Sequence, residues 1–307
     1  MPRSVTAGLD GTRESLAAAD WAAREARLRD LPLHLVHASK GQPYAHAPRG
    51  ADARPRGTTD SGRNRATRVL HQAATVLSGR HTDLHMSTSG VAQQPVPALL
   101  EAAESAEVLV LGSRGLSGVG GFLVGSVALA VVARAQGPVV LVRASERAED
   151  EHLPDPAGHP CTHTPYRDVV LGLNVEHPDD TVLKYAFDAA ERRAANLRVV
   201  HGWTLPRHYN GYGGSLDPEL NDELAAQARR RLADALRPWR EKFPGVDVHE
   251  QAVIGGAGSH LVDASHHAAL VVVGRRNRHT PIGSHIGPVT QAVLHHACAP
   301  VAVIPHD

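Results

Sequence analysis

Short, uninterrupted apolar runs alternate along the chain with longer segments in which apolar residues recur every three to four positions. Residues 108–111 (Val-Leu-Val-Leu) and 139–142 (Val-Val-Leu-Val) contain no polar residue, which is typical of parallel strands buried on both faces of a sheet. In the first half the pattern predicts strands at residues 4–9, 32–38, 83–90, 108–112 and 139–143. It predicts helices between them at residues 15–29, 64–77, 97–103 and 125–135.

Strands that alternate with helices in this way indicate an α/β fold. Right-handed crossovers then build a doubly wound domain, in which a five-stranded parallel sheet is flanked by helices. In such a sheet, ligands bind beyond the carboxyl ends of the strands, where the strand order reverses. The segments that follow residues 9 and 112 are therefore the first places to search for chemistry.

The whole pattern occurs twice. Residues 5–10 (Val-Thr-Ala-Gly-Leu-Asp) align with residues 169–174 (Val-Val-Leu-Gly-Leu-Asn), and residues 137–142 align with 299–304. A period of this length indicates a duplicated domain rather than a solenoid. Between the copies, residues 145–165 contain five acidic residues and four prolines, which is typical of a linker with almost nothing to bury. We predict a first domain at 1–145, a linker at 146–165 and a second domain at 166–307.

Charge and composition narrow the class of protein. Lys and Arg number 32 and so do Asp and Glu, which gives no argument for binding nucleic acid or an anionic membrane. No apolar run approaches the ~18 residues that span a bilayer, and no leader pattern precedes the first strand. The two cysteines, Cys161 and Cys298, offer no disulfide framework and no Cys-based metal site. We expect a cytoplasmic protein that binds neither nucleic acid nor a membrane.

A glycine-rich loop from Gly112 to Gly125 joins the end of a buried strand to the start of a helix. Glycine permits positive φ and close backbone approach, so successive N–H groups can converge on an anion. The positive end of the following helix favours phosphate, and the Ser126 hydroxyl either caps that helix or donates to a phosphate oxygen. The spacing fits neither a Walker loop nor a dinucleotide fingerprint.

Asp10 follows the first strand, at the same edge of the predicted sheet as the glycine-rich loop. Two roles fit its carboxylate. It either accepts hydrogen bonds from a ribose or a base, or caps the helix predicted at residues 15–29. The neighbouring loop favours the first role.

These residues resemble a known family. The pattern Gly-x-x-Gly, nine residues, Gly-Ser, formed by Gly112, Gly115, Gly125 and Ser126, is similar to that of the ATP-binding branch of the universal stress protein family. Residues 5–11, 14–26 and 137–142 share the likeness, which covers both halves except the linker and the polar segments 40–65 and 204–217. The chain resembles the tandem, two-domain form of that family. The resemblance implies an adenine nucleotide alpha hydrolase-like, Rossmann-like fold for each half.

The resemblance also implies a ligand and its contacts. ATP, with or without Mg²⁺, is expected between the strand ends of the first half. By this resemblance, Asp10 contacts the adenosine, and Gly8, Leu9 and Val36 line the adenine slot. It surrounds the ribose and phosphates with Gly112, Gly115, Gly125, Ser126 and Val127.

The resemblance further implies partners. Family members pair through the final strand, so residues 139–142 and 301–304 are expected to pack together as an intramolecular pseudo-dimer. A homodimer and a regulatory protein partner of unknown identity are also compatible with it.

The second half departs from the motif. Asn174 replaces the Asp, Asn277 the second Gly and Pro288 the Ser, whereas Gly274 and Gly287 remain. Pro288 removes a hydroxyl and a backbone N–H at the helix start. Positive charge nearby could compensate, from Arg275, Arg276, Arg278 and His279. Asn174, Gly274, Asn277 and Gly287 are therefore weaker candidates for nucleotide contacts.

The sequence favours a non-enzymatic protein. Phosphoryl transfer needs a positioned base, a metal-binding carboxylate and a cation near the γ-phosphate, but no second acidic residue falls clearly beside Asp10. His266-His267 and His295-His296 lack further ligands at suitable spacing, so no metal site is expected. The favoured interpretation is an ATP-binding stress-response protein with a regulatory nucleotide. The alternatives are a slow ATPase or autophosphorylating protein, and a nucleotide-free interaction scaffold.

Overall fold

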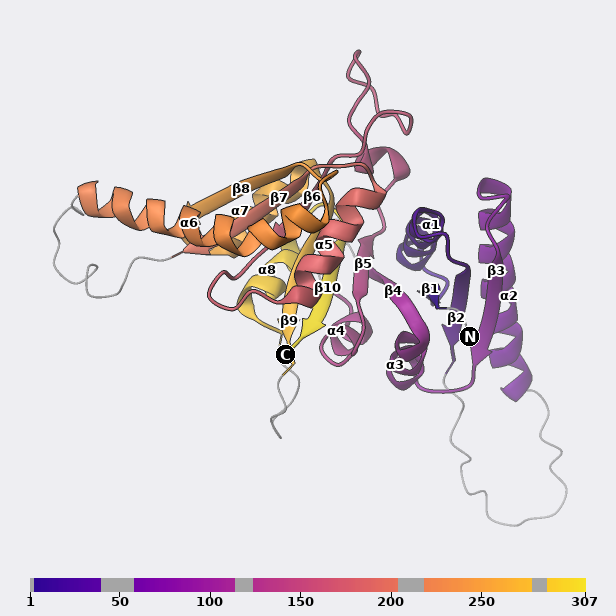
Figure 1. Cartoon of the computed structure of the whole chain (residues 1–307). Coiled ribbons are helices and arrows are strands. Elements are labelled where there is room, and N and C mark those ends of the chain that lie inside the picture. The colour runs from indigo at the N-terminus through magenta and orange to yellow at the C-terminus, as the bar shows by residue number, and fades with distance from the viewer. Residues whose placement is uncertain (1–2, 40–57, 114–123, 204–217, 278–285) are drawn as a thin grey trace, which may run out of the picture. The chain divides into compact units, whose positions relative to one another are not determined.

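The computed structural model describes residues 3–39, 58–113, 124–203, 218–277 and 286–307. The described residues form two compact units, one of residues up to 145 and the other of residues from 146 onward (Figure 1). Both units are built from alternating strands and helices, as the sequence pattern predicts.

The first unit is a five-stranded sheet. Its strands are β1 (Ser4–Leu9), β2 (Leu33–Ala38), β3 (Met86–Val91), β4 (Ala106–Ser113) and β5 (Val139–Arg143). They lie in the order β3-β2-β1-β4-β5, and all neighbours are parallel. Helices α1 (Arg13–Leu28) and α2 (Thr58–Arg80) pack on one face, and α3 (Pro95–Ser105) and α4 (Ser126–Val132) on the other. The strand order reverses between β1 and β4, which is where such sheets bind ligands.

The second unit repeats this plan. Strands β6 (Asp168–Gly172), β7 (Leu197–Trp203), β8 (Val248–Ile254), β9 (Ala268–Arg276) and β10 (Val301–His306) lie in the order β8-β7-β6-β9-β10, again parallel. Helices α5 (Asp180–Arg192) and α6 (Pro218–Lys242) pack on one face, and α7 (Ala257–Ala264) and α8 (Pro288–His296) on the other. The prediction of two tandem doubly wound domains is confirmed.

Small side chains let the helices approach the sheet closely. Helix α1 begins after Thr12, whose hydroxyl accepts a hydrogen bond from the Ser15 N–H at 3.3 Å. Its buried face is mostly alanine around Trp21, which is 1% exposed. An ion pair is also buried there: Arg29 Nε lies 2.6 Å from Glu25 Oε1, and the two side chains are 4% and 0% exposed.

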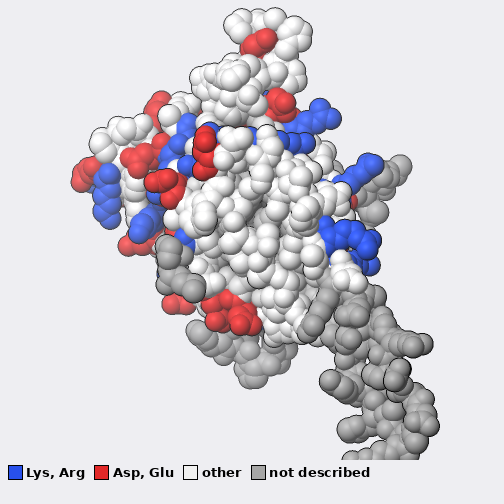
Figure 2. Space-filling model, turned by 90° about the vertical axis from the view of Figure 1, so that its right-hand side faces the viewer, with Lys and Arg blue, Asp and Glu red and all other residues white. Residues whose placement is uncertain are grey.

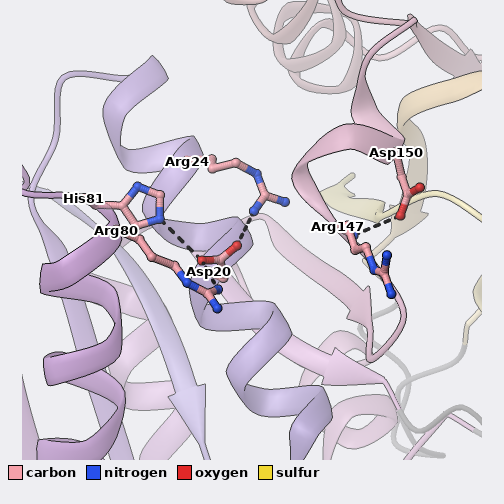
Figure 3. A network of polar contacts seen from close by, with 6 residues as sticks. All are labelled: Asp20, Arg24, Arg80, His81, Arg147 and Asp150. Carbon is pink, nitrogen blue, oxygen red and sulfur yellow. Dashed lines mark hydrogen bonds and ion pairs between the residues drawn. The ribbon is translucent and has the colours of Figure 1, made fainter. Parts of the chain in front are cut away.

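The two units join their paired helices differently. In the first, Arg24 of α1 and Arg80 and His81 at the end of α2 converge on Asp20 of α1, with the nearest atoms 2.5, 3.2 and 3.4 Å apart (Figure 3). In the second unit, aromatic rings connect the paired helices. Phe187 of α5 lies 5.9 Å, centroid to centroid, from Trp239 of α6 and 5.4 Å from Phe243, which follows α6.

Helix α2 begins at Thr58, six residues before the predicted start at residue 64. Residues 58–63 are polar or glycine, so apolar spacing carries no signal there. The rest of the polar segment 40–57, like the predicted loop at 204–217, lies outside the described residues.

The segment predicted as a linker is packed against the second unit. It contains a short 3₁₀ helix, η1 (Ala148–Glu151), which contacts β9. Glu151 and His152 are 1% and 8% exposed, and the His152 ring lies 4.0 Å from that of Tyr166. The expectation that this segment has almost nothing to bury is therefore wrong, because Glu151 and His152 are both buried and the His152 ring packs against Tyr166.

Burial of His34 makes the stability of the first unit depend on pH. Its Nδ1 lies 2.8 Å from Ser87 Oγ and its Nε2 lies 2.9 Å from Ser89 Oγ. Burial lowers the pKa of His34 below its ordinary value, so the folded chain binds fewer protons there than the unfolded chain. The contribution of neutral His34 to the free energy of unfolding is present above about pH 6.5 and is lost as the pH falls below that value.

Urea unfolding between pH 7.5 and 5 should show a smaller loss of stability for His34→Asn than for wild type. Equal losses in the two proteins would contradict the role given to His34. His71→Asn is the matched control, because it removes an imidazole from an exposed position on α2.

The charged side chains do not form a field of one sign. Figure 2 shows groups of both signs on one face: Lys and Arg are mixed with Asp and Glu at the left of the view, and uncharged residues separate them from the other charged groups. Among the residues described, none of the helices combines the length and hydropathy that a membrane crossing requires.

Candidate functional site

The carboxyl ends of β1 and β4 and the start of α4 surround a pocket of about 270 Å³ in the first unit. Neighbouring parallel strands end at the same sheet edge, which brings segments about a hundred residues apart in sequence together. The lining includes most of the residues expected from sequence: Gly8, Leu9, Asp10, Gly112, Gly125, Ser126 and Val127.

Two expected residues are not in this lining. Val36 is 2% exposed inside the sheet, and Ala38, two residues further along β2, lines the pocket in its place. The strand continues past Val36, which pairs with Gly8, so the sheet edge is reached only at Ala38. Gly115 lies outside the described residues.

Asp10 organises the turn between β1 and α1 without capping the helix itself. Its Oδ1 accepts hydrogen bonds from the Thr12 N–H at 2.9 Å and the Thr12 hydroxyl at 2.6 Å, and Thr12 is the N-cap. The carboxylate is exposed at the pocket. Asp10 therefore holds the cap in place from a position that faces the pocket.

At α4 the N-cap is Gly125, which makes no side-chain cap bond, and Ser126 is the first helical residue. Of the two roles open to the Ser126 hydroxyl, capping is therefore not used in this structure. The hydroxyl lies in the pocket lining at the positive end of the helix.

Glycine stands for different structural reasons at the two motif positions that the structure describes, Gly112 and Gly125. A Cβ at Gly112 would lie 2.6–2.8 Å from backbone atoms of Glu14 and Ser15, so glycine is required there for α1 to pack on β4. Among the described residues, none has an atom within 4 Å of a Cβ placed at Gly125, and the φ of −60° and ψ of 146° at this position suit any residue. The described residues around Gly125 leave room for a side chain, and the lack of one leaves the pocket open at this point.

Several lining residues are missing from the expectations: Thr12, Glu14, Ser15, Ala38, Pro95, Leu99, Leu111 and Ala128. Glu14 belongs to the first turn of α1, which begins at Arg13 and reaches the sheet edge, so an acidic residue in addition to Asp10 is part of the lining, which was not expected. The signal available in sequence was the short distance between the end of β1 and the start of α1.

The second unit has a pocket of about 390 Å³ at the corresponding edge. Asn174, Gly274 and Gly287 line it, but Asn277 does not. The Asn277 N–H donates to the His306 carbonyl at 2.5 Å and its Nδ2 to Asp307 Oδ1 at 3.1 Å, which ties it to the chain end after β10. The other polar lining residues are His177, Asp179, Arg275, Arg276, Thr290 and His306.

Within the part of the chain that the structure describes, no three His, Cys, Asp or Glu side chains gather closely enough to hold a metal ion. His266 and His295, from the two histidine pairs, belong to no such group.

Comparison with known proteins agrees with this architecture. A model of the universal stress protein family matches residues 1–143 and 165–305. A universal stress protein of Mycobacterium tuberculosis is 32% identical over 305 residues, which cover 97% of this chain and 96% of the relative. One from Mycolicibacterium smegmatis is 29% identical over 306 residues, or 98% and 96% of the two chains. The crystal structure of a universal stress protein from Archaeoglobus fulgidus, 16% identical, matches the fold with a TM-score of 0.70 over 99% of this chain and 98% of that one. The chain belongs to the universal stress protein family.

Proposed function

We propose that the first unit, residues 1–145, binds ATP and that the protein acts in the cytoplasm as a non-enzymatic, nucleotide-regulated stress protein. The observation that carries this proposal is the open pocket formed by the ends of β1 and β4 and the start of α4. In the part of the chain that the structure describes, nothing occupies the space where a side chain at Gly125 would lie. Helix starts and close-approaching backbone favour phosphate.

In this proposal each side of the pocket has its own task. Gly8, Leu9 and Ala38 border the base, and Asp10 accepts hydrogen bonds from the nucleoside. Gly112, Gly125, Ser126 and Val127 border the ribose and phosphates, joined by Gly115. A regulatory protein partner would then sense the nucleotide-bound conformation.

Replacing Asp10 tests the assignment. A hydrogen bond to a charged group contributes about 1.5–3 kcal/mol, so Asp10→Ala should weaken ATP binding roughly ten- to hundredfold in a calorimetric titration. Asp10→Asn keeps an acceptor for the Thr12 N–H and separates the loss of charge from the loss of the turn. Asn174→Ala, the matched change in the second unit, should leave this binding unchanged. An Asp10→Ala variant that binds ATP like wild type would remove the basis for the first-unit site.

Slow ATP hydrolysis or autophosphorylation is the second candidate function, and Glu14 is the observation that favours it. Glu14 lines the same pocket as Asp10, and acidic residues are the groups that hold a metal ion or orient water in phosphoryl transfer. If this candidate is correct, nucleotide recovered after prolonged incubation is ADP, or the chain carries phosphate. Unchanged ATP supports the non-enzymatic proposal.

Pairing of the two units is a further part of the proposal. We expect residues 139–142 of β5 and 301–304 of β10 to pair within one chain, as in the pseudo-dimer that the family resemblance implies. Cysteines introduced into the two strands should then cross-link within a chain. Cross-links only between chains would favour a homodimer, and a chain that binds no nucleotide would favour the scaffold function.

A further inference from the structure

A histidine of the first unit bridges two serines on the edge strand of its sheet. Nδ1 of His34, on β2, lies 2.8 Å from Oγ of Ser87, and Nε2 lies 2.9 Å from Oγ of Ser89. Both serines belong to β3, which is the edge strand. The nucleotide pocket is bordered by the other end of β2, at Ala38. The four residues from His34 to Ala38 span about 13 Å of strand, so the cluster is separate from that pocket.

The two serines point away from helix α2. A Cβ at Gly90 would lie 3.6 Å from the Cβ of Ala66 on α2, so residue 90 faces that helix. Side chains alternate between the two faces of a strand, which places Ser87 and Ser89 on the opposite face. Ser87 is exposed and Ser89 is half-buried. Ser87 is therefore the hydroxyl that a molecule from solvent can reach.

The imidazole of His34 makes its two hydrogen bonds in opposite directions. In a neutral ring, one nitrogen carries a proton and donates it, and the other nitrogen accepts. Burial lowers the pKa of His34, so the ring is neutral near pH 7. One serine therefore donates its hydroxyl proton to the ring, and the other accepts and holds the orientation of the ring. A hydroxyl bonded to an oriented neutral imidazole is the arrangement that activates a serine as a nucleophile.

At the matching positions of the second unit, an ion pair replaces this cluster. Arg198 stands at the position of His34, and its Nη2 lies 3.4 Å from Oδ2 of Asp168. His249 and Gln251 take the register positions of the two serines. The repeat thus supplies the same strands without a serine hydroxyl at these positions.

We propose that Ser87 is an acyl-acceptor site, at which His34 acts as the general base and Ser89 as a positioning residue. Nδ1 accepts the Ser87 hydroxyl proton, and the Nε2–H donates to Ser89. The Ser87 Oγ forms a bond to the carbonyl carbon of an activated ester while its proton passes to the ring. The bond from that carbon to the leaving oxygen then breaks, and the leaving group departs as an alcohol with the proton from His34. The product is an ester on Ser87.

The surroundings of the ring favour an acyl group over a phosphoryl group. Phosphoryl transfer needs cations around the transferred group, whereas both side chains bonded to the His34 ring are uncharged. Acyl transfer to a hydroxyl depends first on a base that takes the hydroxyl proton, and His34 supplies one.

The test is reaction of the full chain with p-nitrophenyl acetate, followed by mass-spectrometric mapping of the acetylated residues. We expect an acetyl ester on Ser87, formed together with p-nitrophenol. Ser87→Ala, a change at an exposed position, should remove this ester. His34→Gln should slow its formation by a hundredfold or more, since a positioned base contributes about 10²–10⁴-fold. Ser89→Ala should also slow it, and Ser89→Thr, which keeps the hydroxyl, should restore the rate.

Two features of the chain serve as controls. Ser105 is also exposed, but its hydroxyl donates to the Ala102 carbonyl at 3.2 Å, so it reports the background reactivity of a serine. His71→Asn removes an exposed imidazole and should leave the Ser87 rate unchanged. The proposal is overturned if Ser87 of wild type is acetylated no faster than Ser105, or if His34→Gln reacts at the wild-type rate. An ester on Ser89 in place of Ser87 would equally overturn it.

Discussion

Gly125→Asp should abolish ATP binding by the first unit and leave the fold as stable as wild type. The new carboxylate would stand at the pocket where the phosphates are proposed to lie. Two like charges about 4 Å apart repel by ~4 kcal/mol at an effective dielectric constant of ~20, so we expect at least a hundredfold loss of affinity by calorimetry. The fold should tolerate the change, because no described residue has an atom within 4 Å of a Cβ at this position. Asp is also a preferred N-cap, worth a few tenths of a kcal/mol over Gly.

Two matched variants isolate the cause. Gly125→Asn adds a side chain of the same size and the same capping ability without charge, so it should bind ATP more tightly than Gly125→Asp. Gly287→Asp makes the identical change at the N-cap of α8 and should not affect the first site. Equal ATP affinity in wild type and Gly125→Asp would mean that the phosphates do not lie at this helix start.

Glu25→Ala should destabilise the first unit by about 3–5 kcal/mol, the cost of removing one partner of a buried ion pair. Arg29 is 4% exposed at the side chain and its Nε lies 2.6 Å from Glu25 Oε1. Without that carboxylate, a buried guanidinium loses its closest counter-charge. Denaturant unfolding followed by the fluorescence of Trp21, which lies on the same helix, measures the effect.

Two comparisons show whether burial is the reason. Replacing both partners, as Glu25→Leu with Arg29→Met, should recover most of the stability, because apolar residues of similar volume often replace a buried pair without loss. Arg231→Ala removes an equally short pair with Glu176, at 2.5 Å, whose side chains are 51% and 61% exposed, and should cost less than ~1 kcal/mol. A Glu25→Ala cost that small would contradict the account of this pair.

The strands were predictable where apolar runs end at turn-forming residues. The bounds of β1 and β5, residues 4–9 and 139–143, agree with the sequence pattern. The start of α2 was not predictable, because residues 58–63 contain no apolar residue that could mark a buried face. The packing of residues 146–165 was not predictable. Glu151 and His152 are buried by contacts with the second unit, and no local sequence pattern indicates such contacts.

Much of the first pocket followed from one rule, that parallel strands end at a common edge. This rule brings Asp10 and Gly112 together before any side chain is placed. Ala38 rather than Val36 lines the pocket because of where β2 ends relative to β1. Glu14 belongs to the lining because of where α1 begins. The second pocket depends on β10, since His306 reaches Gly274 across the sheet. Such tertiary details decide which residues line each pocket, but they leave no periodic signal in the sequence.

The most direct test of the central claim is a crystal structure of the chain with ATP. We predict nucleotide in the first pocket, with the base near Gly8 and Ala38, Asp10 on the nucleoside, and the phosphates at Gly125 and Ser126. A first pocket that stays empty at a saturating ATP concentration, or nucleotide bound only elsewhere on the chain, would contradict the account.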